Sequence, residues 1–85
     1  MSQRHKLQAI LRDAYRGAIA FRDFERLLRA YGFTLARTTG SHRQYTHPDV
    51  ARPFPVQSDG KDAKRYQLRE FLALIERYDL QMKDE

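Results

Sequence analysis

Apolar side chains recur every three or four residues in three segments of the chain, which is the spacing of one face of an α-helix. The pattern predicts helices over residues 3–16, 22–31 and 63–78. Gly32 is placed to end the second helix, with Phe33 closing the cap by an apolar contact. The three apolar stripes consist of Leu7, Ile10, Leu11 and Ala14, of Phe21, Phe24, Leu27, Leu28 and Tyr31, and of Leu68, Phe71, Leu72, Ile75 and Tyr78.

Between the second and third predicted helices the alternation changes to a period of two, which is typical of β-strands. It predicts strands over residues 33–38, 41–47 and 54–57, with a tight turn at 38–40 and a connecting loop over 48–53. Pro55 cannot donate to a ladder, so we expect the third strand at a sheet edge. Residues 58–62 are expected to form a polar loop.

The predicted order is therefore α-α-β-β-β-α, an α+β fold in which a three-stranded antiparallel sheet has its helices on one face. The other sheet face would stay open. The second strand fits this asymmetry, because alternate residues fall on two different sides. One side would hold Ser41, Arg43, Tyr45 and His47, and the other His42, Gln44 and Thr46.

The length of 85 residues predicts a single domain with one modest core. The formal net charge is +5, and residues 1–36 and 37–69 each hold seven basic against three acidic side chains. This balance favours a polyanionic partner such as nucleic acid, the alternative being a basic protein kept soluble by its charge. The chain has no cysteine and no apolar run long enough for a membrane span, so we expect a soluble cytoplasmic protein.

His42 is the best candidate for chemistry, because it follows Gly40 and Ser41 at the mouth of the predicted hairpin. A neutral imidazole there could take the proton of an RNA 2′-hydroxyl. The alternative is an ordinary, half-exposed strand histidine. A metal site with His47 is not expected, because five residues along a strand put the two side chains on opposite faces, about 16 Å apart. No cofactor is predicted.

Basic side chains that could contact RNA phosphates lie close to His42 in the sequence and in the loop at the start of the last predicted helix, where the alternative is a solvated basic turn. Glycine allows backbone to approach a ligand closely, and a helix N-terminus presents free N–H groups that suit phosphate. We therefore predict an RNA-binding surface that consists of Arg37, Gly40, Ser41, Arg43, Lys61 and Lys64.

The chain also resembles the HicA toxins of bacterial toxin–antitoxin pairs. The resemblance rests on Phe24-x-x-Leu27-Leu28-x-x-Tyr31-Gly32-Phe33, on Gly40-Ser41-His42-Arg43-Gln44-Tyr45, on His47-Pro48-Asp49, and on Lys61 to Leu72. It covers roughly residues 20–80, and residues 1–19 look like the N-terminal extension of a longer subgroup.

This resemblance implies a fold like a double-stranded RNA-binding domain and ribosome-independent cleavage of mRNA. It also implies that His42 is catalytic and that a HicB-like antitoxin blocks the active face. One departure is visible. Many members carry a second histidine after the proline of the third strand, where this chain reads Pro55-Val56-Gln57-Ser58.

Three functional hypotheses follow from the sequence. The first is an endoribonuclease toxin, expected to act without a metal ion. The second is a non-catalytic RNA-binding module on the same fold. The third is a small protein-interaction domain whose charge is incidental. Cleavage that depends on His42 would favour the first, and RNA binding without cleavage would favour the second.

Overall fold

The computed structural model describes residues 3–83 and confirms the predicted α+β order. The helices are α1 (Gln3–Tyr15), α2 (Phe21–Ala30) and α3 (Arg65–Arg77). The sheet strands are β1 (Thr34–Thr39), β2 (His42–His47) and β3 (Val50–Val56), and a two-stranded ribbon follows as β4 (Ser58–Asp59) and β5 (Asp62–Ala63).

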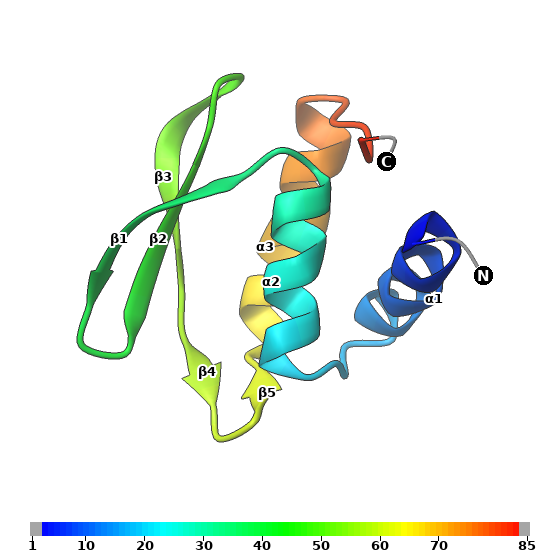
Figure 1. Ribbon diagram of the computed structural model, residues 1–85, viewed down its shortest axis with the longest axis horizontal. Helices are drawn as coiled ribbons and strands as arrows, with labels where there is room; N and C mark the ends of the chain where they lie inside the picture. Colours follow the sequence, from blue (N-terminus) through cyan, green and yellow to red (C-terminus); the bar gives the residue numbers. More distant parts are fainter. Residues whose placement is uncertain (1–2, 84–85) are drawn as a thin grey trace.

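The sheet is antiparallel with strand order β1-β2-β3, so β3 lies at an edge as Pro55 predicts. Figure 1 shows three layers: the sheet, then α2 and α3, then α1 on the side away from the sheet. This arrangement leaves one sheet face without a helix and is consistent with the fold that the resemblance implies. None of the helices in the described part of the chain is long and apolar enough to cross a membrane.

Two sequence predictions for the region after β2 are wrong. Residues 50–53 do not form a loop, because β3 begins at Val50 and only Pro48 and Asp49 connect it to β2. Residues 58–62 are not an irregular loop, because β4 and β5 pair there. Proline is rare in strands, so Pro53 and Pro55 argue against a strand when the sequence is considered alone. An edge strand tolerates them where their missing N–H would face outward.

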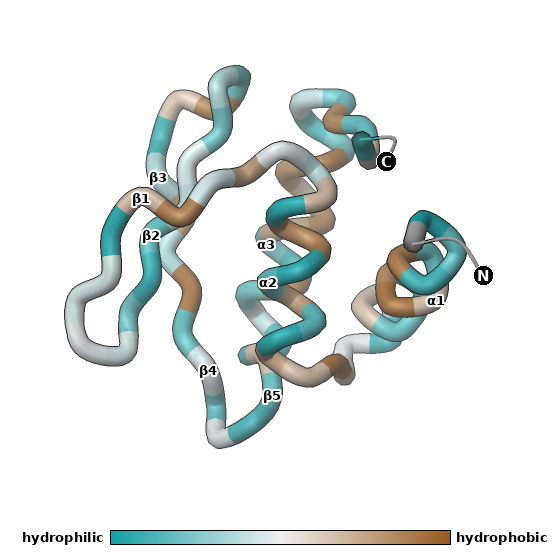
Figure 2. The backbone as a smooth tube through the Cα atoms, in the orientation of Figure 1, coloured by the Kyte–Doolittle hydropathy of each residue, from teal (hydrophilic) through white to brown (hydrophobic). Residues whose placement is uncertain are grey.

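The core lies between the sheet and the α2–α3 layer. Figure 2 shows apolar stretches of α2 and α3 beside each other, whereas β2 is mostly hydrophilic. Phe24, Leu27, Leu28, Leu68 and Phe71 are fully buried, and Phe24 meets Phe71 edge-on with ring centroids 5.5 Å apart. Helix α1 adds Leu7 and Ala14 to the same cluster.

The end of α2 is fixed by the glycine cap that the sequence predicts. Gly32 has a φ of 93°, in the left-handed region that disfavours other residues. The N–H of Phe33 donates to the carbonyl of Leu28 at 2.9 Å, and the N–H of Gly32 donates to that of Arg29 at 3.0 Å. These are the two bonds of a Schellman motif, and they direct the chain from α2 into β1.

Candidate active site

The Gly40-Ser41 turn places His42 at the first position of β2. Thr39 pairs with His42, so the turn between β1 and β2 contains only two residues. Gly40 has a φ of 60°, and within residues 3–83 the only non-glycine residue with positive φ is Asp79. A positive φ at the first of two turn residues is the type II′ geometry, which suits hairpins and favours glycine there. The His42 side chain is exposed at this hairpin mouth.

A bulge in β1 brings Arg37 to the same face as His42. Leu35 pairs with Tyr45, but the next pair is Arg37 with Gln44, so Ala36 is an extra residue on β1. Residues directly opposite each other in an antiparallel ladder share a face. Without the bulge, Leu35 and Arg37 would face the same way, as simple alternation predicts. With it, Leu35 shares the face of its partner Tyr45, whereas Arg37 shares the face of its partner Gln44, which is also that of His42.

The end of β3 supplies a further polar side chain beside His42. Gln44 pairs with Pro55, and continuing this register sets Gln57 opposite His42. The Gln57 amide nitrogen lies 3.0 Å from the Ser41 hydroxyl oxygen. The Lys64 ammonium lies 3.4 Å from the Gln57 amide oxygen. The structure therefore brings Ser41, Gln57 and Lys64 together from the hairpin turn, the sheet edge and the residue that precedes α3.

The backbone of β3 is held at this point by a glutamine from α3. Gln67 is buried, with 5% of its surface exposed. Its amide oxygen accepts the Gln57 N–H at 3.0 Å, and its amide nitrogen lies 3.4 Å from the Pro55 carbonyl. The Gln67 side chain thus makes the contacts that a neighbouring strand would make, and it fixes the distance between the sheet edge and α3.

Lys61 lies in the turn of the β4–β5 ribbon, next to Gly60, and its side chain is exposed. The ribbon is anchored to the start of α2, because the N–H of Phe21 donates to the Lys61 carbonyl at 2.8 Å. The N–H of Ala63 also donates to the carbonyl of Ile19 at 3.0 Å. These backbone bonds hold the Lys61 turn in place while leaving its ammonium group in solvent.

Arg43 lies on the opposite side of β2 from His42. Its guanidinium donates to both carboxylate oxygens of Glu25, at 2.6 and 2.7 Å, and the Tyr45 hydroxyl donates to the same carboxylate. Burial and the Glu25 bond raise the pKa of Tyr45 to about 12. The bond to Glu25 also raises the pKa of Arg43. The predicted phosphate contact at Arg43 thus belongs to a side chain that faces the helices and whose charge is already compensated.

His47 also faces the helix side of the sheet. Its ring centroid is 5.0 Å from that of Phe33, and its Nδ1 accepts the N–H of Asp49 at 3.0 Å. His42 and His47 therefore lie on opposite faces of β2, as the strand period predicts. Within residues 3–83 no group of three or more histidine, cysteine or acidic side chains could hold a metal ion.

Sequence reasoning missed three residues that organise this region, namely Glu25, Gln57 and Gln67. Glu25 had a visible signal, because it follows Phe21 by four residues and precedes Leu28 by three, within the apolar stripe of α2. Gln67 lies next to Leu68 on the buried stripe of α3. Gln57 had no such signal, because its partners become neighbours only when the sheet edge meets α3.

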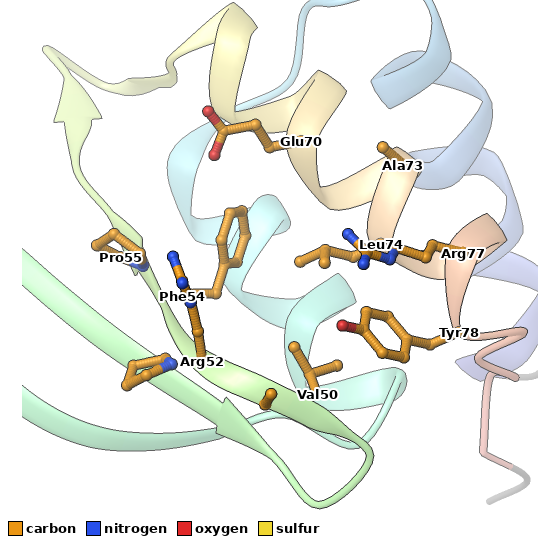
Figure 3. A pocket seen from close by; sticks show the side chains of 11 residues that line it. Val50, Arg52, Phe54, Pro55, Glu70, Ala73, Leu74, Arg77 and Tyr78 are labelled. Carbon is orange, nitrogen blue, oxygen red and sulfur yellow. The ribbon is translucent and has the colours of Figure 1, made fainter.

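A hollow of about 570 Å³ lies between β3 and α3. Figure 3 shows Phe54, Leu74 and Tyr78 around it, with Arg52 and Arg77 among the charged side chains at its border. The described residues that line it include no histidine and no hydroxyl other than that of Tyr78. Histidine is the side chain that most often acts as a general base, and none lines this hollow, so we place the candidate site at His42 on the open sheet face.

The fold and the site together define a small α+β protein with an exposed histidine beside basic side chains. Residues 21–76 match the family described as the HicA toxin of bacterial toxin–antitoxin. This match covers more than half of the chain, and the chain therefore belongs to the HicA family, whose members are the toxins of toxin–antitoxin systems. No curated protein and no solved structure gave a significant match.

Proposed function

We propose that this HicA-family toxin is an endoribonuclease that cleaves mRNA with His42 as the general base and that a HicB-like antitoxin neutralises it. The single observation that carries the proposal is the geometry of His42. It is exposed on the helix-free face, directly after Ser41 at a two-residue turn. Arg37 shares this face, and Ser41 and Lys64 both contact Gln57. A structural histidine would be expected to pack against the core, as His47 does.

The reaction uses a nucleophile that RNA itself carries. His42 takes the proton of a 2′-hydroxyl, whose oxygen attacks the adjacent phosphorus as the bond to the 5′-oxygen breaks. The departing 5′-oxygen takes up a proton from water, His42 returns its proton to solvent, and a cyclic phosphate remains. Cationic and N–H donors at the phosphate stabilise the extra charge of the transition state. The chemistry therefore requires a base and anion-stabilising donors, and cleavage is expected to proceed with EDTA present.

The proposed RNA surface is made of Arg37, Gly40, Ser41, Lys61 and Lys64. Ser41 precedes His42, and Arg37 lies on the same sheet face, opposite Gln44. Lys64 contacts Gln57, which also contacts Ser41. We leave Arg43 out of this surface, because Glu25 compensates its charge on the other side of β2. Each cation that contacts a phosphate should contribute about −0.7 to the slope of log affinity against log salt for single-stranded RNA.

The proposed antitoxin would bind over His42. A basic surface attracts an acidic partner quickly through electrostatic steering, and the same surface is the one proposed to bind RNA. Antitoxin and RNA should therefore compete. In a complex of this chain with its antitoxin, solvent access at His42 should fall and RNA binding should disappear.

The test is inducible expression of the wild type and of His42→Ala, with growth and mRNA integrity followed together. Loss of a general base should slow cleavage by about 10²–10⁴-fold. The exposed position predicts a small loss of stability, about 0.5 kcal/mol. His5→Ala is the matched control, because His5 is exposed on α1, the helix layer farthest from the sheet.

A His42→Ala variant that cleaves mRNA and arrests growth like the wild type would remove His42 from the mechanism. RNA binding by both proteins without cleavage by either would favour the non-catalytic RNA-binding module instead. Partner binding without RNA affinity would favour the interaction domain.

A further inference from the structure

The side-chain amide of Gln57 lies between a hydroxyl and an ammonium group that come from different parts of the chain. Its nitrogen is 3.0 Å from Ser41 Oγ, and its oxygen is 3.4 Å from Lys64 Nζ. The main chain of Gln57 is held in turn by the buried Gln67 side chain. The backbone that carries the bridging amide is therefore fixed, whereas Ser41 is an exposed and Lys64 a half-buried polar side chain.

The chemistry of the three groups fixes which way the amide points. A lysine ammonium has only donors, so it must face the amide oxygen, and the amide NH₂ then faces Ser41. The Ser41 oxygen acts as the acceptor in that bond. Its own hydrogen is left free to donate elsewhere. Gln57 therefore sets Ser41 as a donor and holds Lys64, also a donor, close to it.

We propose that Gln57 is a positioning residue that makes Ser41 and Lys64 a single phosphate-binding pair beside His42. This inference rests on the proposed function and names how the same site holds its substrate. The ligand is a phosphodiester of RNA, whose non-bridging oxygens accept from the Ser41 hydroxyl and the Lys64 ammonium. Because continuing the β2–β3 register by one pair beyond Arg43 and Val56 sets Gln57 opposite His42, a phosphate held by this pair would lie next to the imidazole.

The decisive variant is Gln57→Glu, which keeps the shape of the side chain but replaces the amide NH₂ donor by an acceptor oxygen. A carboxylate accepts from both neighbours, so the Ser41 hydroxyl turns inward and the Lys64 charge is compensated. Gln57→Leu removes both bonds without adding charge and serves as the second variant if Gln57→Glu folds poorly. Gln8→Glu adds the same charge on an exposed position of α1 and is the control.

The probe is a mixed-sequence RNA oligonucleotide with 2′-O-methyl groups throughout, which cannot be cleaved through its 2′ oxygen. We expect Gln57→Glu to weaken its binding by about tenfold or more and Gln57→Leu by about threefold to tenfold, as for loss of charge-assisted hydrogen bonds. Gln57→Glu should also reduce the salt slope by about 0.7, the contribution of one cation. Gln8→Glu should change the affinity by less than about twofold, because a distant surface charge is screened.

A double-variant experiment separates the positioning role of Gln57 from a general effect on folding. Lys64→Met should weaken RNA binding in the wild type and have little further effect in Gln57→Glu, because the two changes act on one unit. Additive losses would show that Lys64 binds RNA independently of Gln57 and would overturn the proposal. Unchanged affinity in both Gln57 variants would overturn it equally.

Binding of the methylated probe does not require cleavage, so the two hypotheses can fail separately. If the wild type binds the probe but never cleaves ordinary RNA, the nuclease function fails and the Gln57 variants still decide the positioning role. If cleavage is intact and the Gln57 variants bind as the wild type does, only the positioning role is refuted. A wild type that binds no RNA refutes both.

Discussion

Replacing Arg43 with methionine should destabilise the protein while leaving its affinity for RNA nearly unchanged. Methionine keeps much of the length of the arginine stem and removes the guanidinium. The Glu25 side chain, only 8% exposed, then loses both bonds from Arg43 Nη1 and keeps only the Tyr45 hydroxyl as its donor. The perturbation therefore leaves a buried carboxylate without its positive partner.

The magnitude follows from how exposed the two partners are. Removing one partner of a fully buried pair costs about 3–5 kcal/mol, whereas an exposed pair contributes about 0–1 kcal/mol. The Arg43 side chain is 42% exposed and the Glu25 side chain is almost buried, so the pair lies between these limits. We expect Arg43→Met to lower the free energy of unfolding by about 2 kcal/mol.

Urea denaturation measures this loss directly. With a slope of about 1–3 kcal/mol per molar, typical of small proteins, the midpoint should fall by roughly 0.7–2 M. Glu25→Gln in the Arg43→Met background removes the stranded charge, so the double variant should lose less than the sum of the single losses. An unchanged midpoint, together with a clear fall in RNA affinity and salt slope, would refute this reasoning and return Arg43 to the RNA surface.

Two further predictions concern Tyr45 and Gly40. Burial first, and the Glu25 bond second, raise the pKa of Tyr45 from its ordinary 10 to about 12. The stability that the protonated Tyr45 hydroxyl contributes is therefore fully present below pH 10 and is lost as the pH rises to about 12. When the free energy of unfolding is followed against pH, this loss of about 3 kcal/mol should be absent in Tyr45→Phe. Gly40→Ala should lower the free energy of unfolding by about 1–2 kcal/mol, because its φ of 60° disfavours L-residues, although an added Cβ would meet nothing within 4 Å. The loss should appear as a lower thermal midpoint. An unchanged midpoint would mean that the turn can change type.

The sequence by itself determined the helices and their order, because each apolar stripe has to be buried and its spacing admits only a helix. It also determined the cap at Gly32, since a glycine after such a stripe can adopt the left-handed conformation that ends a helix. The separation of His42 from His47 followed from the strand period alone. These features depend on residues close together in the chain, where local geometry is set by the residue types.

The tertiary structure decided the features that depend on contacts between residues far apart in the sequence. The bulge at Ala36 reverses the side on which Arg37 lies, and simple alternation along the strand gives no sign of it. Gln57 meets Ser41 and Lys64, 16 residues before it and 7 after it, only because Gln67 holds the sheet edge against α3. Arg43 looks like a phosphate contact in a basic segment, yet Glu25, 18 residues away, compensates its charge. Charge and hydrogen-bonding capacity are properties of single residues, but which partner satisfies them depends on how the layers pack.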